Sequence, residues 1–102
     1  MIFGLSNKQY DQIVKVFSKY QNIEKAILYG SRAKGSQKAY SDIDITLVSD
    51  TLDLSLLQKI EIELDDLMLP FKFDVSNCRT IDNKELLEHI KRVGKVFYEK
   101  QI

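Results

Sequence analysis

A Gly-Ser pair and two aspartates lie ten residues apart in this chain, and their types suit phosphate chemistry. The pair is Gly30-Ser31 after an apolar run, and Asp42 and Asp44 belong to the segment SDIDI at 41–45. A Gly-Ser turn leaving a strand can offer backbone N–H groups and a hydroxyl to a phosphate. A strand with Asp-Ile-Asp places both carboxylates on one face, because side chains alternate. This combination predicts metal-assisted phosphoryl or nucleotidyl transfer.

A third carboxylate, Asp74, lies in a later segment that reads as a strand. Apolar residues at 71, 73 and 75 alternate with polar residues at 72, 74 and 76, which predicts a half-buried strand with Asp74 on its polar side. If this strand lies beside that of Asp42 and Asp44, three carboxylates crowd one open face and repel one another. A divalent cation removes the repulsion, and Mg²⁺ prefers a few carboxylates plus substrate phosphates.

Two helices are expected to support these strands from the earlier part of the chain. Ser6–Gln9 has the form of a capping box, and the apolar residues behind it recur with helical spacing. A second periodic segment is expected to begin near Asp53 or Ser55 and to be stopped by Pro70.

A third helix and four strands complete the expected order. The helix is capped by Asp82 or Asn83 and ends at Gly94. The expected strands are residues 23–29, 43–48, 71–76 and 95–100, and residues 31–40 form a loop or one to two helical turns. This order predicts one layered α/β domain over residues 1–102, although the strand order does not follow from it.

Composition limits the partners and the compartment. Fifteen basic and fifteen acidic residues cancel, which argues against binding to an extended nucleic-acid duplex. The single cysteine, Cys78, excludes an intrachain disulfide and suits a reducing cytoplasm, and no apolar run approaches the ~20 residues that cross a bilayer. Cys78 is expected to be a bystander, and His89 a surface or boundary residue of the last helix rather than a catalyst.

The motifs together resemble those of the minimal nucleotidyltransferases in the DNA polymerase β superfamily. That pattern is an apolar residue, Gly-Ser, a short spacer, Asp-apolar-Asp and a third Asp on a later strand. Here Tyr29 precedes the Gly-Ser pair, and the segment GSRAKGS at 30–36 is typical of the minimal subgroup, with Lys34 a mild departure. The resemblance covers nearly the whole chain. It implies a mixed sheet of about four strands, with helices packed mainly on one face.

The resemblance also implies a role for each candidate residue. Asp42 and Asp44 would coordinate the catalytic metals, a two-metal Mg²⁺ site with Mn²⁺ as an alternative, and Asp74 would complete one site and help to activate the attacking hydroxyl. Gly30 and Ser31 would bind the β- and γ-phosphates of a nucleoside triphosphate, ATP by expectation, with Arg32 as a helper. The hydroxyl would attack the α-phosphorus and release pyrophosphate.

Three functions stay open at this point. Minimal members of this kind are commonly paired with a helical HEPN-type protein as toxin and antitoxin, which implies transfer of AMP to the partner. A second reading is transfer to a small molecule, such as an aminoglycoside, with a separate substrate-binding subunit. A third is a non-catalytic antitoxin that acts by contact alone. The sequence leaves self-association open.

Overall fold

The computed structural model describes residues 1–101, and its elements follow the expected order. The elements are α1 (Asn7–Ser18), β1 (Lys25–Tyr29), α2 (Ser31–Lys34), β2 (Ile43–Val48), α3 (Leu54–Asp65), β3 (Phe73–Asn77), a 3₁₀ turn η1 (Cys78–Thr80), α4 (Lys84–Val93) and β4 (Lys95–Glu99). Only η1 was not expected from the sequence. No helix within residues 1–101 is long and apolar enough to span a membrane.

The four strands form one mixed sheet in the order β3-β2-β1-β4. β1 pairs with both β2 and β4 in antiparallel fashion, whereas β2 and β3 are parallel. A parallel pair needs a long crossover connection, which α3 supplies here. The mixed four-stranded sheet expected from the family resemblance is therefore confirmed.

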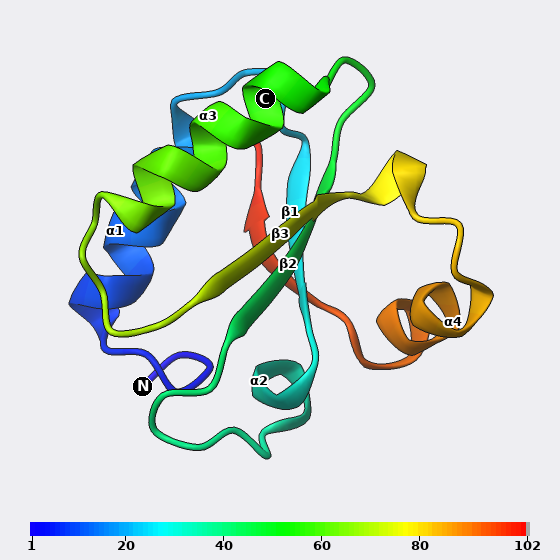
Figure 1. The fold of residues 1–102 in the computed structure, drawn as a ribbon. Coiled ribbons are helices and arrows are strands. Elements are labelled where there is room, and N and C mark those ends of the chain that lie inside the picture. Colours follow the sequence, from blue (N-terminus) through cyan, green and yellow to red (C-terminus); the bar gives the residue numbers. More distant parts are fainter. Residues whose placement is uncertain (102) are drawn as a thin grey trace.

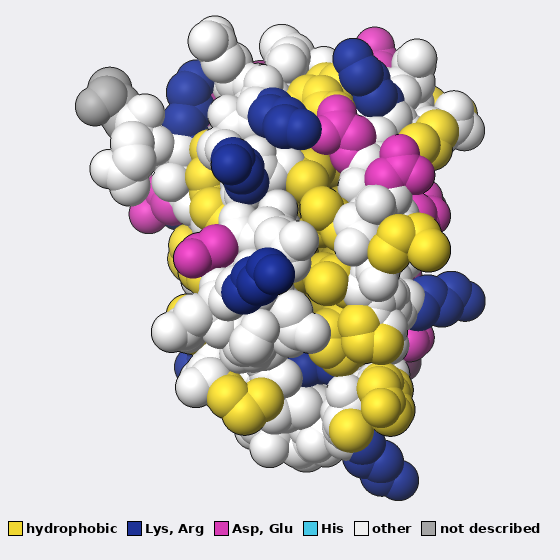
Figure 2. All heavy atoms as spheres, turned by 90° about the vertical axis from the view of Figure 1, so that its left-hand side faces the viewer, with side chains coloured by type: hydrophobic (Ala, Val, Ile, Leu, Met, Phe, Trp, Pro, Cys, Tyr) yellow, Lys and Arg dark blue, Asp and Glu magenta, His cyan; other side chains and the backbone are white. Residues whose placement is uncertain are grey.

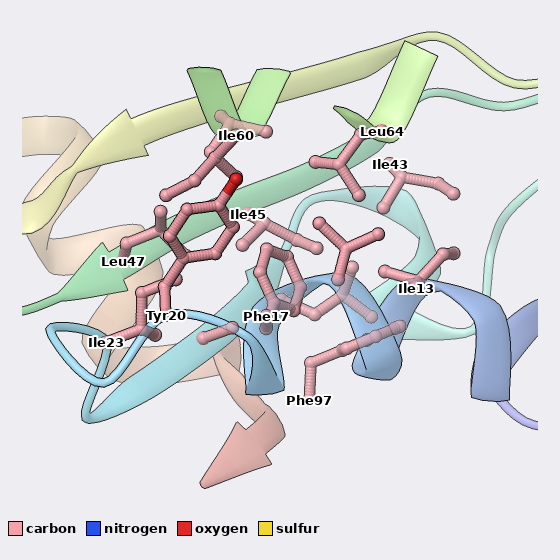
Figure 3. Close-up of a cluster of buried hydrophobic side chains, with 14 of the residues drawn as sticks. Ile13, Phe17, Tyr20, Ile23, Ile43, Ile45, Leu47, Ile60, Leu64 and Phe97 are labelled. Atoms are coloured by element: carbon pink, nitrogen blue, oxygen red, sulfur yellow. The ribbon is translucent and has the colours of Figure 1, made fainter. Parts of the chain in front are cut away.

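Helices α1 and α3 cover one face of the sheet, and α4 lies on the other side near β1 (Figure 1). The main core lies between α1, α3 and the sheet, where side chains from the two helices point toward those of the strands (Figure 3). On β2, Ile43, Ile45 and Leu47 are fully buried in this core. The alternate residues of β2, beginning with Asp44, therefore face the opposite side of the sheet.

The helix starts agree with the predicted caps. Ser6 and Gln9 form a complete capping box at α1. The side chains of Asp53 and Asn83 accept hydrogen bonds from the backbone N–H groups at the third positions of α3 and α4. These caps satisfy backbone N–H groups that have no partner inside the helix. They explain why local sequence located the helix starts well.

The predicted end of the second helix is wrong. Helix α3 ends at Asp65 rather than continuing to Pro70, because Met68 adopts a left-handed conformation with φ +56° that no helix can contain. The first and third strands also begin two residues later than expected, at Lys25 and Phe73.

A surface hollow bordered by two lysines lies between α1 and the segment that follows α3. Val16 and Leu67 line it together with Gln12, Lys15 and Lys19. Figure 2 shows this side of the molecule, with hydrophobic side chains lying between basic and acidic ones.

One cluster between α1 and α3 leads to a prediction about pH. The Tyr20 hydroxyl donates to Glu63, whose carboxylate also pairs with Lys19 at 3.1 Å. Burial, followed by the hydrogen bond and charge of Glu63, raises the pKa of Tyr20 to about 12. Because this folded-state pKa exceeds the unfolded value, the stabilisation is present below about pH 10 and is lost as pH rises towards 12.

The hydrogen bond from Tyr20 lowers the pKa of Glu63, so the Glu63 contribution is instead lost on acidification. We expect the free energy of unfolding to fall more steeply between pH 10 and 12 in the parent than in Tyr20→Phe, measured by urea denaturation. Tyr40→Phe, at a tyrosine that is 72% exposed, is the control and should follow the parent. Parallel curves for the parent and Tyr20→Phe would contradict this assignment.

Candidate functional site

The parallel pairing of β2 and β3 brings two of the predicted carboxylates together. Asp44 lies directly opposite Asp74 in the strand register. Both side chains are on the sheet face away from the main core, where Asp44 is half-buried and Asp74 is exposed. Asp42 is exposed one residue before β2 begins. The pairing of β2 with β3, which the sequence could pose only as a condition, is present in the structure.

Three carboxylates place negative charge on this face of the sheet. Burial raises the pKa of Asp44, and the charges of Asp74 and then Asp42 raise it further, whereas His89 acts weakly in the opposite direction. The pKa of Tyr29 is also raised, first by burial and then by Asp74. The folded protein therefore disfavours the ionised form of Asp44, a cost that a bound cation would remove.

The donor set fits Mg²⁺ in its chemistry, although it is not a preformed cage. No three His, Cys, Asp or Glu side chains within residues 1–101 are grouped to hold an ion by themselves. Asp44 and Asp74 instead offer hard carboxylate oxygens from two adjacent strands. This is the arrangement expected for Mg²⁺, which takes one or two carboxylates and completes its octahedron with waters and substrate phosphates.

The Gly-Ser turn lies close against the carboxylate of Asp44. Tyr29, the last residue of β1, pairs with Asp44, so Gly30 follows at the level of that carboxylate. Gly30 has φ +77° and ψ −155°, a conformation that is essentially restricted to glycine. A Cβ at Gly30 would lie 2.3 Å from Oδ2 of Asp44. A glycine is therefore required here for two reasons: the backbone conformation of the turn and the space that the Asp44 carboxylate occupies.

His89 holds the same turn, which the sequence did not reveal. The Gly30 N–H donates to Nε2 of His89 at 3.1 Å, and the imidazole meets the Tyr29 ring edge-on with centroids 6.1 Å apart. His89 is half-buried on α4, so its expected place at a boundary agrees with the structure. Its partner is 59 residues away in sequence, and no local pattern could have indicated the contact. The Gly30 amide, expected to be free for a phosphate, is occupied by His89 here.

The expectation that Arg32 helps to bind phosphate is not supported by its position. Its side chain is buried, with the residue only 2% exposed, and its guanidinium donates to the carbonyl oxygens of Phe3 and Ser41. These bonds direct it away from the solvent that a triphosphate would occupy. Ser31, the first residue of α2, is half-buried beside Gly30.

Polar side chains continue along the face beyond the two aspartates. The Ser76 hydroxyl donates to that of Thr46 at 3.0 Å, one step further along the paired strands β3 and β2. Cys78 lies in η1, after β3 has ended, and its thiol is free. Thr46 and Ser76 therefore continue the row of polar side chains that begins with the two aspartates, and Cys78 lies beyond this row.

Similarity to known proteins agrees with this arrangement. Residues 11–102 match the family described as polymerase beta, nucleotidyltransferase. The Haemophilus influenzae protein named probable protein adenylyltransferase MntA is 31% identical over 74 residues, which are 72% of this chain and 64% of that protein. The matched segment thus spans a little under two thirds of the relative.

Solved structures share the fold at lower identity. A chain in a crystal structure of a toxin–antitoxin with AMP-PNP has a TM-score of 0.72 and 24% identity, over 90% of this chain and 74% of that one. A chain in a Shewanella oneidensis complex of a tri-AMPylated HEPN toxin with an MNT antitoxin has a TM-score of 0.69 and 20% identity, over 95% and 75%. A putative nucleotidyltransferase from Sulfolobus solfataricus scores 0.56 at 21% identity, over 91% and 79%. From the family match, the mixed sheet and the paired aspartates beside a Gly-Ser turn, we conclude that this chain belongs to the polymerase beta nucleotidyltransferase family.

Proposed function

We propose that the chain is an Mg²⁺-dependent nucleotidyltransferase that moves AMP from ATP to a hydroxyl of a protein partner. The observation that carries this proposal is the meeting of Asp44, Asp74 and the Gly30 turn on one open face. A family fold alone would not support activity, because function depends on the site rather than on the fold. Here the carboxylates expected for the chemistry are intact and adjacent.

Each residue has a role in the proposed reaction. Asp42 and Asp44 would hold Mg²⁺, with Asp74 completing one site, and the ion would supply charge neutralisation at the phosphates when bound. Asp74 is more exposed than Asp44, to which it is paired in the sheet. It would accept a hydrogen bond from the acceptor hydroxyl and help to remove its proton. The Gly30-Ser31 turn would hold the β- and γ-phosphates, with Ser31 the first donor because the Gly30 amide already binds His89. The acceptor oxygen bonds to the α-phosphorus as pyrophosphate leaves.

The relatives support the nature of the acceptor. One is named a probable protein adenylyltransferase, and one solved complex contains an AMPylated HEPN toxin with an MNT antitoxin. We therefore propose a HEPN-type helical protein as the acceptor, and silencing of that protein in the cytoplasm as the role of the transfer. In this proposal residues 1–102 act as one catalytic domain.

Two isosteric variants test the site. We expect Asp44→Asn and Asp74→Asn each to lower AMP transfer at least about 100-fold, since each removes a charge that acts on the reacting groups. Asp44→Asn should weaken Mg²⁺-dependent ATP binding, whereas Asp74→Asn should retain much of it. Transfer is followed as pyrophosphate release and as mass gain on the partner, and ATP binding by calorimetry with and without Mg²⁺.

The fold should survive the first substitution. The raised pKa of Asp44 means that its ionised form is disfavoured in the folded state, so Asp44→Asn should maintain or increase the free energy of unfolding at pH 7. Asp11→Asn, at an exposed aspartate of α1, is the matched control and should transfer at the parental rate. Parental transfer by Asp74→Asn would refute the three-carboxylate site. A folded complex without AMP transfer, mass gain or pyrophosphate would favour the contact-only antitoxin.

A further inference from the structure

Arg32 is a buried cation whose hydrogen-bond partners are backbone carbonyls. The residue is 2% exposed, and its Nη1 donates to the Phe3 carbonyl at 3.0 Å. Its Nε and Nη2 both donate to the Ser41 carbonyl, at 3.2 Å and 2.8 Å. The guanidinium also lies over the Phe71 ring, 4.6 Å from the centroid. Burying a charge is costly unless it is hydrogen-bonded, and the two carbonyl groups supply these bonds here.

Two of the segments that Arg32 contacts lead into the candidate site. Ser41 immediately precedes Asp42, and Phe71 lies two residues before β3, which carries Asp74. The next backbone bond along the first segment runs from Ile43 N–H to the Lys72 carbonyl at 2.8 Å. The backbone of Asp42 is therefore fixed on one side by the guanidinium and on the other by pairing with β3.

The N-terminal turn closes over the same guanidinium. Ile2 and Leu5 form an isolated bridge, and the two residues between them, Phe3 and Gly4, both have positive φ, of 54° and 79°. This conformation presents the Phe3 carbonyl to Arg32. A Cβ at Gly4 would lie 2.7 Å from Nε2 of Gln37 and 2.8 Å from Nη1 of Arg32, so there is no space between the turn and these two side chains.

We propose that Arg32 is a positioning residue that holds Asp42 at the site by clamping the Ser41 carbonyl against the N-terminal turn and the Phe71 ring. This inference rests on the proposed function, because it assigns Arg32 to the placement of a metal-binding carboxylate. Lysine cannot replace it. An ammonium group keeps the charge but has neither the planar fork for two bonds to one carbonyl nor the flat face that stacks on an aromatic ring.

Two variants test the clamp from opposite sides. Arg32→Lys keeps the charge and removes the fork, whereas Gly4→Ala leaves Arg32 intact and pushes on its guanidinium and on the neighbouring Gln37 side chain. The control is Arg79→Lys. Arg79 is exposed and also donates to a backbone carbonyl, that of Asp50 at 2.7 Å, but this carbonyl does not belong to the candidate site. Each variant is compared with the parent in amide hydrogen exchange and in the Mg²⁺ concentration that gives half-maximal AMP transfer.

We expect both clamp variants to speed exchange at the Lys38, Ser41 and Ile43 amides at least about tenfold, with little change at Ile13 in α1. The half-maximal Mg²⁺ concentration should rise at least about tenfold, as it does when groups that orient metal ligands are lost. A merely structural role predicts faster exchange throughout and an unchanged Mg²⁺ midpoint per folded molecule. That result, or unchanged exchange at residues 38–43 in folded Arg32→Lys, would overturn the proposal. If the parent shows no Mg²⁺-dependent transfer, the proposed function fails, and the exchange measurement still decides whether the clamp exists.

Discussion

The chain alone should release pyrophosphate from Mg²⁺ and ATP at least about a thousandfold more slowly than the chain with the proposed HEPN-type partner. Positioning an acceptor in line with the reacting atom can contribute about 7–11 kcal/mol to catalysis, and an unheld acceptor loses this contribution. Asp42 and Asp74 are exposed, and α4 packs against β1, the strand next to β2. A partner docked on the sheet face that carries Asp74 would supply both the hydroxyl and its orientation.

The measurement compares the purified chain with the chain mixed with partner recovered from the native cells. Pyrophosphate is followed with each nucleoside triphosphate in turn, and both proteins are weighed by mass spectrometry. A gain of one or more AMP units on the partner, absent with Asp44→Asn, is the expected result. Full activity without the partner would contradict the prediction. Transfer that requires an aminoglycoside and a second subunit would instead support the small-molecule reading.

Gly30→Ala should cause the largest loss of stability among single substitutions near the site. The added methyl group would lie 2.3 Å from the Asp44 carboxylate. The backbone conformation at this position is also strained for any residue that carries a side chain. We expect a loss of at least about 3 kcal/mol in the free energy of unfolding. Transfer by the molecules that remain folded should fall at least about 100-fold, because a shift of about 1 Å in a catalytic group has an effect of this size.

Gly35→Ala provides the comparison for Gly30→Ala. Gly35 has a similar φ of +79°, but an added Cβ would meet nothing within 4 Å. It should therefore cost only about 1–2 kcal/mol, the ordinary cost of a left-handed residue. Adding Asp44→Ala to Gly30→Ala should recover part of the stability and none of the transfer. Equal losses for the two glycine variants, measured by urea denaturation, would show that the contact with Asp44 has no effect.

Most of the local structure of this chain could be predicted from the sequence, because it depends on neighbours in sequence. The capping residues Ser6, Asp53 and Asn83 mark helix starts through bonds to amides three residues ahead. Alternation at 71–76 indicated the exposed side of Asp74 for a similar reason. The end of α3 was missed because it depends on the left-handed turn at Met68, and Pro70 was the more visible signal.

The tertiary structure decided which segments meet at the site. Strand order could not be predicted, since the parallel pairing that sets Asp44 opposite Asp74 depends on how α3 crosses the sheet. The same holds for His89, whose imidazole reaches a turn in a distant part of the chain.

Arg32 shows the difference most clearly. Its place next to a Gly-Ser pair indicated a phosphate ligand, but a short helix does not by itself fix the direction of a long side chain. That direction was set by the Phe3 and Ser41 carbonyls and the Phe71 ring, which come from three other parts of the chain. The sequence by itself thus determined which chemical groups are present and how they are spaced, through local backbone periodicity. Only tertiary packing decided which of them face one another, because those contacts join residues that have no local influence on each other.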